Sequence, residues 1–220
     1  MFEGLERITF SKDWITIILL VVLVLITLVK NNFNDRFTKL FSLFYSDKYY
    51  TDYLKTNPLL FNKFHFIFFF IISFNISLII FNSFIAFKPL EFDSDFLFFL
   101  QINLIAILYL FIRYFLGYFI AFLFNINDKQ KYVTFLKISN LSLISVIIFP
   151  FLVLVNYSAG LFHKFLITFS IIAIILLFFL RYFTLVKKEK INFNSLFYLI
   201  LYLCALEIAP FIVIYKTFVD

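Results

Sequence analysis

The sequence is poor in the residues that carry most enzyme chemistry and in those that break helices. It contains one cysteine, two histidines, three glycines and four prolines in 220 residues. The single cysteine, Cys204, excludes a disulfide within the chain. His65 and His163 lie far apart, and no HExxH, GxSxG or phosphate-binding glycine motif is present. We therefore expect no metal site, no cofactor and no enzymatic activity.

Charged residues are also scarce. They make up 15% of the chain, against 64% hydrophobic residues, and the mean hydropathy is +1.01. A soluble domain of this size has too little interior to bury so much apolar surface. A net charge of +6 is compatible with nucleic acid binding. The basic residues, however, lie in loops between apolar runs, so we expect no nucleic acid partner. The composition indicates an integral membrane protein surrounded by membrane lipids.

What the sequence does contain is long apolar runs, each close to the roughly 20 residues that a helix needs to cross a bilayer. Continuous runs with few turn residues favour helices over a membrane barrel of short alternating strands. We predict an all-α, polytopic transmembrane helical bundle of about six spans, forming a single membrane domain over residues 1–220. The predicted spans are residues 14–29, 64–87, 96–124, 133–155, 165–185 and 195–218.

Lysine and arginine are unevenly distributed between the two sets of loops. Thirteen of the 19 fall in the first, third and fifth loops or at their membrane edges, and five fall in the other loops and the two tails, with Arg113 the remaining one. Cytoplasmic loops of membrane proteins carry such an excess of positive charge. We therefore expect these three loops to be cytoplasmic and both termini to lie on the opposite side.

The first cytoplasmic loop, residues 30–63, is the longest segment between spans. Within this loop, the i, i+3, i+4, i+7 spacing of one helix face is followed by Phe37, Leu40, Phe41 and Phe44. This pattern predicts an amphipathic helix lying at the inner membrane surface. The alternative is a helix that docks a cytoplasmic partner.

Two charged residues lie deep within predicted spans, Arg113 in the third and Glu207 in the sixth. Charges near the bilayer centre are costly and are usually paired or functional. At about 1.5 Å per residue, both lie roughly 16–18 Å from the predicted cytoplasmic boundary. Opposite signs at similar depth predict a buried Arg113–Glu207 pair. It either fixes how the two helices pack, or serves a proton, an ion or a partner's charge.

Other residues in the spans support close packing or bending. Gly117, one turn beyond Arg113, allows another backbone to approach, while Pro210 and Pro150 are predicted to bend the sixth and fourth spans. Amide and hydroxyl side chains in lipid commonly join helices through hydrogen bonds, and the fourth span offers the hydroxyls of Ser142 and Ser145. The predicted polar contacts of this kind are Gln101, Asn103, Asn75 and Asn140.

The segment FYLILYLCALEIAPFIVIYK carries a YLC-x-LE-x-x-P run that includes Cys204, Glu207 and Pro210. It resembles the last helix of a bacterial family known as domain of unknown function 4271. A basic residue in a mid-chain helix of that family would correspond to Arg113. The resemblance implies a multi-pass protein of the inner (cytoplasmic) membrane of a member of the Bacteroidota, and in that membrane the charge bias described above predicts that both termini are periplasmic. The family has no established activity, so the resemblance implies no mechanism.

Short loops and the absence of a catalytic set favour a protein that acts by packing against other membrane spans. We expect a non-enzymatic integral membrane subunit of a larger inner-membrane complex, with other inner-membrane subunits as partners. Protein secretion or gliding machinery is the setting that lineage analogy suggests. One alternative is a small transporter or an ion- or proton-conducting protein that uses Arg113 and Glu207. Another is a membrane enzyme or lipid-binding protein with an aromatic interior.

Overall fold

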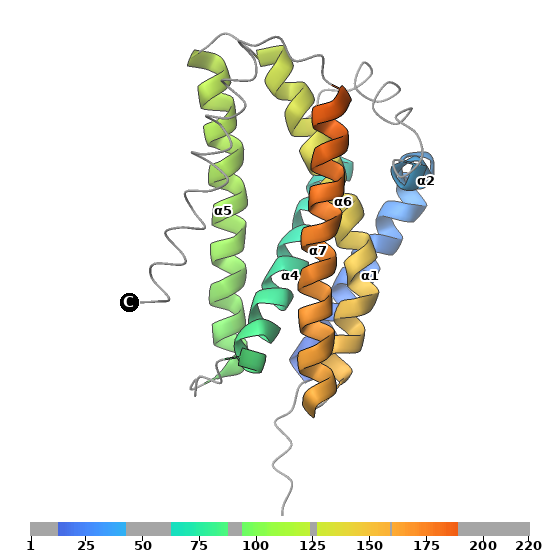
Figure 1. Cartoon of the computed structure of the whole chain (residues 1–220), viewed down its shortest axis with the longest axis vertical. Coiled ribbons are helices and arrows are strands. Elements are labelled where there is room, and N and C mark those ends of the chain that lie inside the picture. Colours follow the sequence, from blue (N-terminus) through green and yellow to red (C-terminus); the bar gives the residue numbers. More distant parts are fainter. Residues whose placement is uncertain (1–12, 43–62, 88–93, 124–126, 159, 189–220) are drawn as a thin grey trace, which may run out of the picture.

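The computed structural model describes residues 13–42, 63–87, 94–123, 127–158 and 160–188. Within these residues the chain is all helical, which confirms the predicted fold class (Figure 1). The helices are α1 (Asp13–Asn32), α2 (Asn34–Ser42), α4 (Lys63–Phe87), α5 (Asp95–Leu123), α6 (Asn127–Tyr157) and α7 (Gly160–Lys188).

Five of the described helices, α1, α4, α5, α6 and α7, are long and apolar enough to cross a membrane. They correspond to the first five predicted spans, and the sixth, residues 195–218, lies outside the described residues. The largest difference in bounds is at α6, which begins at Asn127 rather than at residue 133. Its polar first turns continue the helix beyond the apolar window, which runs over Thr134–Tyr157.

Two helices form the centre of the bundle. In the apolar windows of α4 and α6, 56% and 50% of the residues are buried, against 22–28% in α1, α5 and α7. Helix α4 packs against α1, α5, α6 and α7, and Figure 1 shows it crossing behind α7 between the outer helices. A helix that is apolar on all sides suits this position, because every side of it meets another helix.

Aromatic side chains fill much of the interior. At the end where α1 begins, Trp14 contacts Phe81, Phe96 and Phe99 with ring centroids 5.2, 5.6 and 5.3 Å apart, which joins α1 to α4 and α5. At the other end, the Phe64 ring meets Phe33 edge-on and lies tilted against Phe68, with ring centroids 5.8 and 4.8 Å apart. Since lipid offers no hydrophobic drive for helix association, such close van der Waals packing is a main source of stability.

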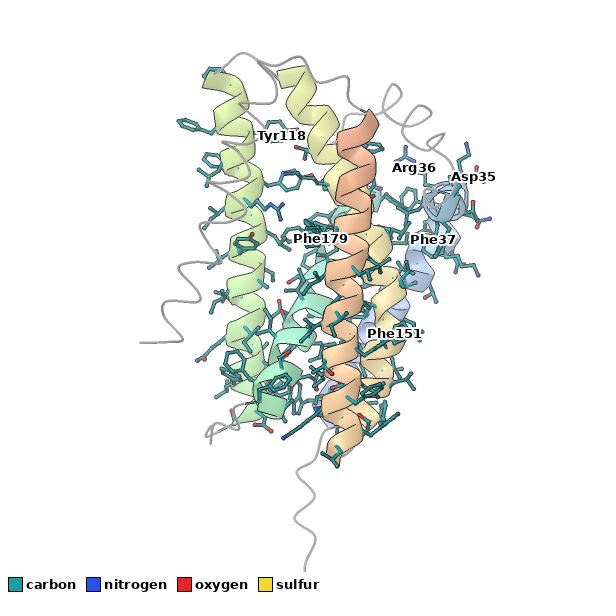
Figure 2. The ribbon with its side chains drawn as sticks, in the orientation of Figure 1. Asp35, Arg36, Phe37, Tyr118, Phe151 and Phe179 are labelled. Atoms are coloured by element: carbon teal, nitrogen blue, oxygen red, sulfur yellow. The ribbon has the colours of Figure 1, made fainter. Side chains whose placement is uncertain are left out.

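Helix α2 is the amphipathic helix predicted in the first loop, but its apolar face is covered by protein. Phe37 is 8% exposed and Leu40 is 0% exposed, and both belong to the core cluster shared by α1, α4 and α6. Figure 2 shows Phe37 on the side of α2 toward the bundle and Asp35 on the far side. These two residues pack on protein, because α2 lies against α1 and α6. The position of α2 at the membrane surface stays a prediction. Phe41 is exposed, and Phe44 lies outside the described residues.

The turn between α6 and α7 depends on a glycine in the left-handed region. Gly160 has a φ of +63°, a conformation that L side chains rarely adopt. The end of α6 is closed by the Ser158 amide and the Ser158 hydroxyl, which both donate to the Val155 carbonyl at 3.2 and 2.8 Å. This short connection makes α6 and α7 antiparallel neighbours.

Candidate functional site: buried polar groups of the membrane bundle

Only one member of the predicted charge pair falls within the described residues. Arg113 is half-buried on α5, on the side of the helix that also carries the buried residues Leu110 and Gly117. The close helix approach predicted at Gly117 stays a prediction. Glu207 and Pro210 lie outside the described residues, so the Arg113–Glu207 pair stays a prediction.

A hydrogen bond between α4 and α5 fixes the level of Arg113 along the bundle. The Ser73 hydroxyl donates to Asn103 Oδ1 at 3.1 Å, and both side chains are buried. Helices α4 and α5 are antiparallel, so moving forward along α5 and backward along α4 leads toward the same end of the bundle. Arg113 lies ten residues after Asn103 on α5. Lys63 lies ten residues before Ser73 on α4. At about 15 Å of helix in each case, Arg113 lies near the level where α4 begins. It is therefore closer to the predicted cytoplasmic end than counting along α5 alone indicates.

Asn75 of α4 makes a polar contact between the two central helices. Its Nδ2 donates to the hydroxyl of Ser145 at 2.6 Å and to the Ser145 carbonyl at 3.0 Å. Asn75 is 2% exposed and Ser145 is 5% exposed. A two-fold contact of this kind in lipid fixes the register of α4 against α6. Asn75 is one of the amides predicted to join helices.

Ser139, Ser142 and Ser145 follow one another at intervals of three along α6, so they line one side of that helix. Ser139 and Ser142 are both 0% exposed. We call these three serines together with Asn75 the polar seam. Small side chains at a helix interface let two backbones approach closely, which suits the contact that Ser145 makes with Asn75 of α4.

The remaining predicted polar contacts differ in placement. Asn103 makes the predicted bond between helices, and Asn140 is buried on α6, 7% exposed, next to Ser139. Gln101 instead lies on the exposed side of α5. Gln101 and Asn103 are two positions apart, so their side chains are separated by about 200° around a helix of 3.6 residues per turn. The two amides therefore could not both face the bundle.

Pro150 lies inside α6 without ending the helix. Because proline has no amide hydrogen, the Val146 carbonyl lacks its usual intrahelical donor. Val146 directly follows Ser145, so this carbonyl lies one turn before Pro150 and beside the polar seam.

The two histidines lie at opposite ends of the bundle, as the spans predicted. His65, near the start of α4, is buried with its ring against Phe64 and Phe135. His163, near the start of α7, has its Nδ1 2.9 Å from the Val155 carbonyl. Among the described residues there is no group of three or more His, Cys, Asp or Glu that could hold a metal ion.

Five apolar helices around a buried polar centre define an integral membrane protein of the polytopic helical class. The chain belongs to the family described as Domain of unknown function (DUF4271), which it matches over residues 15–218. No curated protein and no solved structure matches the chain. Family membership therefore supports the resemblance found in the C-terminal segment and extends it over most of the chain.

Ser73 and Ser139 belong to this polar centre but were not among the residues predicted from the sequence. Serine in an apolar run is common enough to be passed over, because its hydroxyl can bond to its own helix. The signal that was available is the spacing of Ser139, Ser142 and Ser145, which is a helical stripe of small polar residues in an otherwise apolar segment.

Proposed function

We propose that this chain is a non-enzymatic membrane subunit of a larger inner-membrane complex. The observation that carries the proposal is the distribution of apolar surface over the described helices. The outer sides of α1, α5 and α7 expose large apolar side chains, among them Leu20, Phe111 and Leu176 at 56, 64 and 54%. Such surfaces suit lipid, and they equally suit the spans of partner subunits, which are as apolar as lipid tails.

The proposal is also supported by what the described helices offer for chemistry. Several of their buried polar side chains bind one another across helices, as in the Ser73–Asn103 and Asn75–Ser145 contacts. Side chains used in this way join helices instead of presenting a reacting group to a substrate. A protein of this kind acts through assembly, and protein secretion or gliding machinery is the setting we propose for it.

A crosslinking scan in native membranes tests the proposal. A photoreactive amino acid is placed singly at Leu20 on α1, Phe111 on α5 and Leu176 on α7, with the buried Phe68 of α4 as the matched control. We expect a discrete product of higher mass from at least one outer position and none from Phe68. Mass spectrometry of that product, together with a mild-detergent pull-down, then identifies the partner. A 26.4 kDa chain that purifies alone, with no protein crosslink at any position, would contradict the proposal.

A second candidate function is a small transporter or an ion- or proton-conducting protein. The observation that favours it is a cationic side chain, Arg113, half-buried within a membrane-spanning helix. Ionisable groups in such positions often mark an ion or substrate path. Glu207→Gln separates the two functions. A transporter shows flux in proteoliposomes that the variant loses while its partners are retained, whereas a subunit shows no flux with either residue at position 207.

A further inference from the structure

Three polar atoms in the polar seam have no hydrogen-bond partner within the described part of the chain. They are the Asn75 Oδ1, the Ser139 hydroxyl and the Ser142 hydroxyl. Their residues are 2, 0 and 0% exposed, so bulk water does not reach them. Inside a membrane protein, buried polar groups of this kind need a partner, because lipid offers none.

The spacing of the seam residues places the three serines on one side of α6, and Ser145 on that side contacts Asn75 of α4. Asn75 Nδ2 is bonded to the Ser145 hydroxyl at 2.6 Å, so its Oδ1 is held at the surface of α6. Ser142 lies one turn before Ser145 on the same side of α6, and Ser139 lies one turn further. The Val146 carbonyl, which Pro150 deprives of its helical donor, adds another acceptor beside the seam.

The chemistry of these atoms selects the ligand. The amide oxygen of Asn75 and the Val146 carbonyl only accept hydrogen bonds, while the serine hydroxyls both donate and accept. A metal cation would be held here by neutral oxygens alone, since no member of the seam is a carboxylate. Water can donate two hydrogen bonds and accept two, and buried water typically makes about three such bonds to otherwise unpaired groups.

We propose that the polar seam between α4 and α6 binds ordered water within the membrane bundle, bridging Asn75 Oδ1 to the Ser142 hydroxyl. The centre of the bundle is then a hydrated helix interface, and Asn75 is satisfied on both sides of its amide. This inference is independent of the proposed function, because it concerns the chain alone.

The direction in which one substitution changes the melting temperature tests the proposal. If the Ser142 hydroxyl bonds a bridging water, Ser142→Ala removes one of the few partners of that water and lowers the melting temperature by a few degrees. If the hydroxyl is buried, dry and unpaired, the same substitution removes a desolvation penalty and raises the melting temperature. Ser77→Ala is the matched control, since Ser77 is also 0% exposed but donates to the Ser73 carbonyl of its own helix.

A second measurement detects the water directly. Solid-state NMR of the full chain in bilayers measures magnetisation transfer from water to the side-chain amide of Asn75, with the buried Asn82, which donates to the Leu78 carbonyl, as the control. We expect transfer to Asn75 that exceeds transfer to Asn82 and falls in Ser142→Ala. Absence of transfer to Asn75 overturns the proposal whatever the melting temperature does. An unchanged or raised melting temperature in Ser142→Ala, with transfer unaffected, overturns the bridging role of Ser142.

Discussion

At the scale of single residues, the Ser73–Asn103 bond makes a clear prediction. Asn103→Leu removes the acceptor of the buried Ser73 hydroxyl, and hydrogen bonds between membrane helices contribute about 0.6 kcal/mol on average and up to about 1.7. We expect a loss of stability of about 1 kcal/mol, measured by thermal or denaturant unfolding in detergent micelles. Gln101→Leu is the control, because Gln101 is exposed on the same helix, and it should leave stability unchanged. Equal losses in both variants would contradict the role assigned to Asn103.

The predicted Arg113–Glu207 pair also belongs to this scale. If the pair joins two spans, Arg113→Met or Glu207→Gln alone leaves an uncompensated buried charge, which is strongly destabilising. The double variant removes both charges, so we expect it to recover most of the folded, membrane-inserted protein that either single variant loses. Fluorescence-detected size-exclusion chromatography of all three variants measures this recovery. A double variant no better than the worse single variant would show that the two residues act separately.

Residue types alone predicted part of the polar centre. Amides in apolar spans are rare enough to be significant, and Asn75 and Asn103 do join helices. What the sequence could not supply was the relative register of the helices. Register depends on which side chains meet. The Ser73–Asn103 contact therefore gives a different depth for Arg113 from the depth counted along its own helix. Choosing between Gln101 and Asn103 required the same information.

At the scale of elements, the α6–α7 turn depends on Gly160. Its φ of +63° costs a residue with a side chain about 1–2 kcal/mol, although nothing lies within 4 Å of an added Cβ. We therefore expect Gly160→Ala to lower stability by about 1 kcal/mol through the backbone alone. Gly160→Asn is the control, since asparagine tolerates this conformation, and it should lose less. Thermal unfolding measures both, and an alanine variant as stable as wild type would contradict the argument.

Helix α2 gives the second prediction at this scale. Leu40 is 0% exposed beneath α2, whereas the adjacent Phe41 is 38% exposed. Leu40→Ala should destabilise the docked helix by about 2 kcal/mol or more, as large-to-small substitutions in packed cores do. Limited proteolysis should then cleave the first loop faster, while Phe41→Ala should change the rate little. The sequence predicted this helix from its periodicity, but periodicity does not distinguish lipid from protein as the cover of an apolar face.

At the scale of the whole molecule, the described helices divide the basic residues between two ends of one bundle. The end of α1, helix α2, the start of α4 and the end of α7 lie together at the upper end in Figure 1. This end holds Lys30, Arg36, Lys39, Lys63 and Lys188. The opposite end holds Asp13, Asp95 and Lys164, at the starts of α1, α5 and α7. Each long apolar run predicts one crossing of the membrane, so successive loops lie at alternate ends of the bundle. The apolar runs were therefore sufficient to predict this grouping.

Absolute orientation is the prediction that remains, and it follows from the charge difference between these ends. Positively charged loops stay in the cytoplasm, so the end that carries α2 should be cytoplasmic. We expect a phosphatase reporter, active only outside the cytoplasm, to be inactive when fused after Lys188 and active when fused in the segment between α4 and α5. A green fluorescent protein reporter should give the reverse pattern at the same two sites. Since both reporters are read at both ends, a poorly expressed fusion cannot imitate an inverted topology. The inverted pattern in both would place α2 outside and show that charge does not set the orientation of this chain.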